Sequence, residues 1–177
     1  MEPWFWAIGG VIVLFGFVVF RGAPYVPSHR RFAKAALEEL YPLGKKDVLI
    51  DLGSGDGVIL RLAAERGARA IGYELNPALV LISKFLSRRH PLAETRLADF
   101  WLIDLPKDTT VVYAFAVTRD MPKLARKLQR TADKTGHEIQ LITYGLPLKD
   151  KEPSGQLQAH RLYTFEPAPA TLQTPQA

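Results

Sequence analysis

The chain has 177 residues, of which 47% are apolar, and it carries a formal net charge of +5. This length suits one domain of ordinary size with short additions. The chain contains no cysteine, which excludes disulfides, thiolate nucleophiles and thiolate metal sites and is consistent with a reducing compartment.

The first 21 residues are predicted to form a transmembrane anchor. Residues 4–20, WFWAIGGVIVLFGFVVF, have no charged or strongly polar side chain, and as a helix this run would extend about 26 Å. That length is near the lower limit for the ~30 Å hydrocarbon core of a bilayer. A cleaved signal peptide is disfavoured because Glu2 is the only charge before the run and no A-x-A site follows closely. A buried soluble helix is disfavoured because the run has no polar face.

The residues after the anchor predict its orientation. Arg21, Arg30, Arg31 and Lys34 follow the apolar run, whereas no basic residue precedes it. The positive-inside rule therefore predicts a single-pass membrane protein whose main domain lies in the cytoplasm. Residues 22–27, GAPYVP, form a short linker that its two prolines stiffen. The basic excess suits weak binding of anionic lipid or nucleic acid, or an ordinary basic surface.

Helix and strand patterns alternate after the linker. Ser28 is predicted to cap a helix over 29–41, and Asn76-Pro77 is typical of the start of another helix, which Pro91 would end. Further helices are predicted over 58–66 and 120–133. The predicted strands cover 47–52, 69–74, 94–98, 110–117, 137–144 and 160–165. This alternation predicts an α/β domain over 28–166 with a doubly wound, mostly parallel, Rossmann-like sheet. Its last strand would be an antiparallel edge strand, and residues 167–177 would be a disordered tail.

A glycine-rich turn, DLGSGDG at 51–57, joins the first predicted strand to the next helix. Glycines in this position let the backbone approach a ligand closely. The spacing G-x-G-x-G differs from the dinucleotide fingerprint G-x-G-x-x-G, because Val58 stands where the last glycine would be required. Asp51 and Asp56 would repel a pyrophosphate but attract the ammonium and sulfonium groups of S-adenosylmethionine (SAM). The cofactor-binding residues predicted in this turn are Asp51, Gly53, Ser54, Gly55, Asp56 and Gly57.

Two more acidic residues stand at the ends of the next two predicted strands. Glu74 ends the second strand, where a carboxylate can accept both ribose hydroxyls of a nucleoside. Asp99 follows the third strand, where its carboxylate can accept from an adenine amino group while Phe100 packs on the ring. Each residue alone would be a solvated strand end or a turn residue more often than a ligand. Together with Asp51 they form a joint pattern, because ligands of open α/β sheets bind at the carboxyl ends of strands.

These motifs resemble those of class I SAM-dependent methyltransferases, in particular the membrane-anchored lysine methyltransferases of the ATP synthase c-subunit and the adenine nucleotide translocase. The resemblance is carried by PYVPS (24–28), DLGSGDG (51–57), GYELNP (72–77) and DFW (99–101). Beyond residue 105 it fades, and the chain is predicted to be one strand short of the usual seven.

The resemblance implies a role for each matching position. Asp51 and the glycines of the turn would hold the methionine end of SAM. Glu74, with Leu75 and Asn76 beside it, would bind the ribose, and Asp99 with Phe100 would bind the adenine. Tyr25 and Pro27 would belong to a segment that closes over cofactor and target.

The resemblance implies methylation of a lysine on an integral membrane protein near the bilayer. Methylation of a lipid or quinone and a non-catalytic SAM-binding scaffold remain alternatives. A nucleic-acid acceptor is disfavoured because residues 116–119, AVTR, stand where base methylases commonly carry N-P-P-Y. No metal site is predicted, because the four histidines lack ligand spacing. No catalytic residue is predicted, because desolvation beside the sulfonium lowers the pKa of an acceptor lysine.

Overall fold

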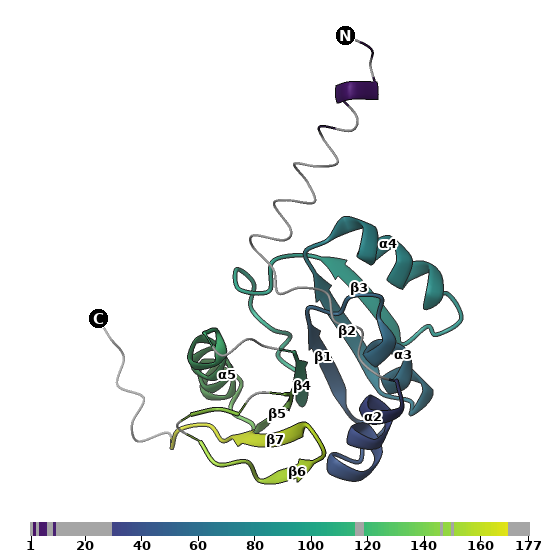
Figure 1. Ribbon diagram of the computed structural model, residues 1–177. Coiled ribbons are helices and arrows are strands. Elements are labelled where there is room, and N and C mark those ends of the chain that lie inside the picture. The colour runs from purple at the N-terminus through teal and green to yellow at the C-terminus, as the bar shows by residue number, and fades with distance from the viewer. Residues whose placement is uncertain are drawn as a thin grey trace.

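The computed structural model describes residues 2, 4–6, 9, 30–115, 119–145, 147–149 and 151–169. Within these ranges seven strands form one sheet in the order β3-β2-β1-β4-β5-β7-β6 (Figure 1). Their bounds are β1 (Val48–Leu52), β2 (Arg69–Glu74), β3 (Ala93–Leu97), β4 (Val111–Ala114), β5 (Ile139–Tyr144), β6 (Gly155–Leu157) and β7 (His160–Phe165). Strands β1 to β5 are parallel, and β7 is antiparallel to both β5 and β6. The predicted mostly parallel α/β sheet is confirmed.

The prediction that the chain is one strand short is wrong. Strand β6 is the extra strand, and it pairs with β7 from Gly155 to Leu157. Strand β7 is antiparallel as predicted, but β6 rather than β7 forms the edge of the sheet. The sequence GQL has no apolar alternation, so this strand depends on the free backbone groups that β7 offers as a neighbour.

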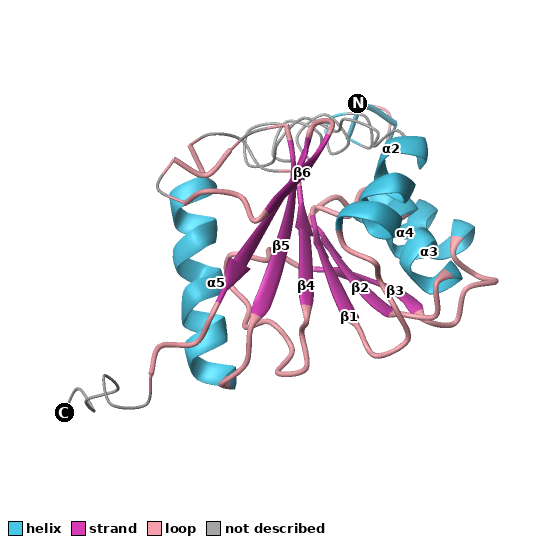
Figure 2. Ribbon diagram, turned by 90° about the horizontal axis from the view of Figure 1, so that it is seen from below, coloured by secondary structure: helices cyan, strands magenta, loops and turns pink. Residues whose placement is uncertain are grey.

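Helices cover both faces of the sheet (Figure 2). On one side lie α2 (Arg30–Ala35), continued by the π-helical turn η1 (Ala36–Leu40), α3 (Val58–Glu65) and α4 (Pro77–Leu86), and on the other lies α5 (Met121–Thr135). Alternate strand residues supply the two cores: Leu49 and Ile142 pack toward α3, whereas Ile50 and Leu141 pack toward α5. Two buried clusters on opposite faces are expected of parallel strands covered on both sides.

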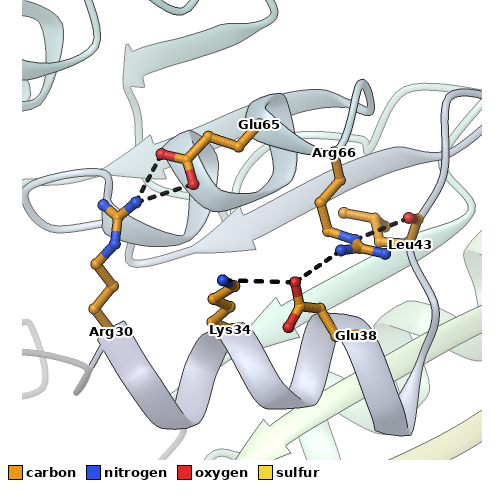
Figure 3. Close-up of polar contacts among 6 residues, drawn as sticks. All are labelled: Arg30, Lys34, Glu38, Leu43, Glu65 and Arg66. Carbon is orange, nitrogen blue, oxygen red and sulfur yellow. Dashed lines mark hydrogen bonds and ion pairs between the residues drawn. The ribbon is translucent and has the colours of Figure 1, made fainter.

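Helix α2 and its continuation η1 are held against α3 by charged side chains (Figure 3). Arg30 Nη2 donates to both carboxylate oxygens of Glu65, at 2.7 and 2.9 Å. Arg66 donates to Glu38 at 2.9 Å and to the carbonyl of Leu43 at 3.1 Å. These side chains are 32–54% exposed, so each pair contributes only about 0–1 kcal/mol. Their main effect is to fix the position of α2 and η1 against α3.

Part of the predicted architecture falls outside the described ranges. Among the described residues no helix is long and apolar enough to cross a membrane. Most of the predicted anchor, the linker and the segment with Tyr25 and Pro27 lie outside those ranges, so they stay predictions. At the other end, Ala168 N donates to Asp133 at 2.9 Å, so the first residues of the predicted tail lie against α5.

Candidate active site

The candidate site lies at the carboxyl ends of β1, β2 and β3, three adjacent strands of the sheet. Asp51 is the penultimate residue of β1, Glu74 is the last of β2, and Asp99 follows β3 by two residues. The chain leaves β1 toward β2 on one side and returns to β4 on the other, so β1 ends at a topological switch point. Ligands of open α/β sheets bind in the crevice at such a point. The structure therefore brings together the three acidic positions predicted from the sequence.

The glycine turn takes a backbone shape that side chains disfavour. Gly53, Gly55 and Gly57 have φ values of 83°, 53° and 77°, all in the left-handed region. At Gly57 an added Cβ would lie 2.1 Å from Ser83 Oγ of α4. The glycines therefore let the turn adopt this backbone conformation, and Gly57 lets the start of α3 lie against Ser83 of α4.

Glu74 connects the glycine turn to the start of α4. Its Oε2 accepts from Gly55 N at 2.9 Å and its Oε1 accepts from Asn76 N at 2.8 Å. Each carboxylate oxygen has a second lone pair, so Glu74 can still accept the two ribose hydroxyls that its position predicts. Asn76 in turn caps α4, because its Oδ1 accepts from Ala78 N at 2.9 Å. Leu75 lies half-buried between them.

Asp51 is the most perturbed acid of the site. It is 3% exposed, and burial, followed by the proximity of Glu74 and Asp56, holds the pKa of its carboxyl well above the ordinary value. A buried carboxyl with negative neighbours favours a cation in the crevice, because a positive charge offsets both effects. The ammonium and sulfonium of SAM are such cations.

The other acid of the turn is partly neutralised by its surroundings. Asp56 Oδ2 lies 3.5 Å from Arg61 Nη2, and its Oδ1 accepts from Val58 N at 3.3 Å. Ser54 is buried, and its Oγ has no hydrogen-bond partner within the described ranges. It lies over Gly72, where an added Cβ would come within 2.5 Å of it. Of the two acids of the turn, Asp56 therefore already has a cationic neighbour in Arg61, whereas the charged groups that perturb Asp51 are both acidic.

The adenine side is built by the loop after β3. Asp99 Oδ1 accepts from Trp101 N at 2.9 Å, and within the described part of the chain no hydrogen bond to its Oδ2 occupies that second oxygen. The rings of Phe100 and Trp101 lie 4.6 Å apart and pack on the core beneath α5. Lys123 of α5 lies over the Trp101 ring at 4.1 Å. This loop therefore offers one acceptor and an aromatic surface, which suits a purine.

A polar pair that no sequence pattern indicated lies on the other side of Asp51. Tyr113 of β4 is the in-register neighbour of Asp51, and its hydroxyl lies 2.9 Å from Nε2 of the buried His160. Burial lowers the pKa of His160 to about 4, so the imidazole is neutral near pH 7. The ring of Tyr144 lies 4.9 Å from that of His160. Because 47 residues separate Tyr113 from His160, no local motif could have shown this pair.

No group of His, Cys, Asp or Glu side chains in the described ranges could hold a metal ion. The described residues instead fit SAM: a buried acid for its cationic end, Glu74 for the ribose, and Asp99 with Phe100 for the adenine. This sheet order, with an acidic edge at the ends of β1, β2 and β3, is that of the class I SAM-dependent methyltransferase fold.

The comparisons with known proteins narrow this class. The chain belongs to the ANTKMT methyltransferase domain family, which matches residues 51–155. It is 38% identical over 109 residues to the ATP synthase c-subunit lysine N-methyltransferase of Xenopus laevis, covering 60% of this chain and 47% of the relative. It is 34% identical over 110 residues to the adenine nucleotide translocase lysine N-methyltransferase of Mus musculus, covering 60% and 47%. The chain thus spans about half the length of these relatives.

A solved structure extends the likeness over more of the chain. The RNA methyltransferase from Salinibacter ruber, in complex with S-adenosyl-L-homocysteine, superposes with a TM-score of 0.64 and 26% identity. The match covers 86% of this chain and 98% of that one. It includes the C-terminal half of the domain, where the sequence motifs fade.

Replacing Glu74 by Ala is expected to weaken SAM binding by about 1–3 kcal/mol, because charge-assisted hydrogen bonds to the ribose are lost. The loss of the acceptor for Gly55 N should also loosen the glycine turn. Calorimetric titration with SAM measures the effect. Glu94→Ala is the matched control, because Glu94 lies on the neighbouring strand but pairs with the exposed Arg96. Equal affinities of the two variants would remove Glu74 from the cofactor site.

Proposed function

We propose that this protein uses SAM to methylate the side-chain amine of a lysine on an integral membrane protein. The observation that carries the proposal is the acidic edge formed by Asp51, Glu74 and Asp99 in a chain of this family. The relatives named for the ATP synthase c-subunit and for adenine nucleotide translocase support lysine as the acceptor. The predicted anchor at residues 1–21 supports an acceptor displayed near a bilayer.

Bound SAM supplies an electrophilic methyl group, and the transfer forms a carbon–nitrogen bond as the carbon–sulfur bond breaks. The protein's part is to position and desolvate the two reactants. The acceptor lysine must first lose a proton, which costs about 4–5 kcal/mol at neutral pH from a reference pKa of ~10.4. Desolvation next to a sulfonium lowers that pKa, so the proton can leave to solvent before transfer.

Tyr113 and His160 lie one strand beyond Asp51, and both side chains are only 1% exposed. A histidine whose pKa is about 4 is a poor proton acceptor near pH 7. We therefore assign His160 the role of holding the Tyr113 hydroxyl through its Nε2. Because both side chains are buried, we assign the pair a structural role behind the site, and neither residue is assigned as a general base.

The acceptor is tested by incubating membranes with methyl-labelled SAM and the full-length protein. Protein, lipid and RNA are then separated, and label in protein is assigned to residues by mass spectrometry. We expect label on lysine of an integral membrane protein, and its loss with Glu74→Ala but not with Glu94→Ala. Label in lipid alone, or in RNA alone, would replace the lysine proposal with that acceptor class.

The experiment includes the RNA fraction because a groove with several basic side chains lies beside α5. The groove has a volume of about 680 Å³, and its charged lining consists of the bases Lys123, Lys127, Arg130 and Lys134 and the acids Asp104 and Asp133. Its lysines already have partners, however. Lys127 donates to the carbonyl of Ile103, Lys134 pairs with Asp104 at 2.6 Å, and Lys123 covers Trp101. Their engagement favours a structural role over phosphate binding.

The anchor is tested separately from the chemistry. We expect the full-length protein to stay in the membrane pellet after an alkaline carbonate wash, because residues 4–20 lack charge and basic residues follow them. Replacing Val13 and Phe15 by Asp should release it, because charges at the centre of a membrane helix cost about 2.5–3.5 kcal/mol each on insertion scales. Replacing Lys107 by Asp, far from the run in sequence, serves as the control. Extraction of the unmodified protein by carbonate would contradict the anchor.

A further inference from the structure

Helix α4 exposes its apolar side and turns a more polar side toward the domain. Four large apolar side chains point away from the domain, with exposed fractions of 69% for Leu81, 47% for Ile82, 64% for Phe85 and 41% for Leu86. The side that faces the domain is more polar. There Ser83 and Ser87 are buried beside Val80, and Ser83 Oγ lies 2.6 Å from Thr95 Oγ1 of β3. A soluble helix normally buries its apolar stripe and exposes its polar one.

The exposed stripe is contiguous along the helix. Leu81, Ile82 and Phe85 are spaced i, i+1 and i+4, so they lie side by side on one face over more than a turn. Leu92, just before β3, and Leu97, at its end, are also exposed. Single exposed apolar residues are normal, but a patch of this kind marks a surface that meets another apolar phase. We call Leu81, Ile82, Phe85 and Leu86 the α4 face.

The charges along α4 and the turn after it have one sign, and the nearest acid given by the structure, Glu94 of β3, pairs with Arg96. No acidic residue occurs between Pro77 and Leu92, whereas this stretch contains Lys84, Arg88 and Arg89, all exposed. Arg88 lies over the Phe85 ring at 4.3 Å and donates to the Phe85 carbonyl at 2.9 Å. An apolar stripe bordered by basic side chains matches the boundary between acyl chains and anionic headgroups.

We propose that the α4 face inserts into the interface of a bilayer that contains anionic lipid. A second copy of the chain fits less well, because pairing two α4 faces would oppose like charges across the interface. The chain's own apolar run fits less well too, because residues 4–20 contain no acid to pair with the basic border. The proposal shares the membrane location with the proposed function but not the identity of the acceptor.

This contact would set the orientation of the site. Helix α4 begins at Pro77, three residues after Glu74, so its N-terminal end lies at the cofactor edge of the sheet. An interfacial helix lies in the plane of the bilayer with its apolar face ~5–10 Å deep. The α4 face would therefore hold the crevice beside the headgroup layer, where a loop of a membrane protein can enter. The predicted anchor alone would not fix this rotation.

The test uses the full-length protein, which has no native cysteine. The single-cysteine variants Ile82→Cys and Gln156→Cys are labelled with an environment-sensitive fluorophore. Gln156 is the matched control, because it is exposed on β6 at the opposite edge of the sheet from β3. The proteins are reconstituted into phosphatidylcholine vesicles with and without phosphatidylglycerol, and quenching by nitroxide-labelled lipid is measured. Flotation of the vesicles verifies that protein is bound.

We expect quenching at residue 82 at least about threefold greater than at residue 156, because interfacial helices reach the acyl boundary. Phosphatidylglycerol should increase it, and combining Lys84→Gln, Arg88→Gln and Arg89→Gln should remove that increase. Equal quenching at the two positions, or failure of the protein to float, would overturn the proposal. A shielded fluorophore at residue 82 that lipid does not quench would also overturn it, in favour of a protein partner. SAM titration of each variant distinguishes these outcomes from a loss of the cofactor site.

Discussion

Asp51→Asn is expected to make the free protein more stable and to weaken its binding of SAM. Asp51 is 3% exposed, and burial together with Glu74 and Asp56 raises its pKa in the folded protein. An ionised carboxylate at this position therefore opposes folding. The neutral amide of asparagine has nearly the same shape and lacks this cost. The free energy of unfolding should therefore rise by roughly 0.5–2 kcal/mol, which is typical of stabilising substitutions at functional sites.

The gain should depend on pH in a defined direction. Between the ordinary pKa of an aspartate and the raised pKa of Asp51, the folded state holds a proton that the unfolded state has released. The stability of the unsubstituted protein therefore falls as pH rises through this window. The advantage of Asp51→Asn is greatest above the raised pKa and vanishes below the ordinary one. Thermal unfolding measured across the acid and neutral range checks this.

The same substitution should reduce SAM affinity by about 10–100-fold at neutral pH, because a charge-assisted contact with the cationic end is worth ~1.5–3 kcal/mol. For the unsubstituted protein, affinity should fall with decreasing pH, because a protonated Asp51 must release its proton to bind the cation. Asp104→Asn is the control for both measurements. Its carboxyl is exposed and pairs with Lys134, which lowers its pKa. An Asp51→Asn variant with unchanged stability and affinity would refute the assignment.

Gly57→Ala is expected to cause a larger loss of stability than the same change at Gly136. Both glycines have similar left-handed φ values, 77° and 75°, so alanine is strained at both, by about 1–2 kcal/mol. At Gly136 no atom lies within 4 Å of the added Cβ, whereas at Gly57 Ser83 Oγ would lie 2.1 Å from it. Overpacking of this kind adds about 1–3 kcal/mol. Because Gly136 matches Gly57 in backbone conformation, this control separates backbone strain from the collision between Gly57 and Ser83 of α4.

A double substitution tests the cause of the difference. Adding Ser83→Ala removes the oxygen that collides, although Ser83 Cβ would still lie 3.3 Å from the new Cβ. Part of the excess loss at Gly57 should therefore be recovered, and none at Gly136. Denaturant unfolding measures stability. SAM titration should show weaker cofactor binding for Gly57→Ala but not for Gly136→Ala. Equal losses of stability at the two glycines would contradict the collision.

Much of the fold was determined by local signals in the sequence. The predicted strand at 69–74 matches β2, which is buried along nearly its whole length, and the strand predicted at 160–165 matches β7. Asn76 caps α4 through its own side chain as its position next to Pro77 predicts. The three acidic strand ends were also visible, because parallel strands place every carboxyl end at one edge.

Other strands and helices end at different residues than predicted, because their ends depend on contacts with other parts of the chain. The strand predicted over 110–117 ends at Ala114, and residues 116–118 lie outside the described ranges. The helix predicted over 29–41 widens into the π-helical turn η1, whose end is closed by Tyr41 N donating to Ala36 O at 2.9 Å. Strand β6 exists because β7 lies beside it and not because of its own residues. Hydrogen bonds to distant backbone have no counterpart in a local pattern.

Only the tertiary structure decided the state and surroundings of the site residues. The raised pKa of Asp51 follows from complete burial beside Glu74 and Asp56, and the pairing of Tyr113 with His160 joins strands far apart in sequence. The sequence determined that α4 has an apolar side but not that this side points outward. That depends on which elements cover the edge of the sheet next to β3, and in the described part of the chain none covers the α4 face. A helical repeat specifies which residues share a face, whereas packing against the rest of the chain decides what that face meets.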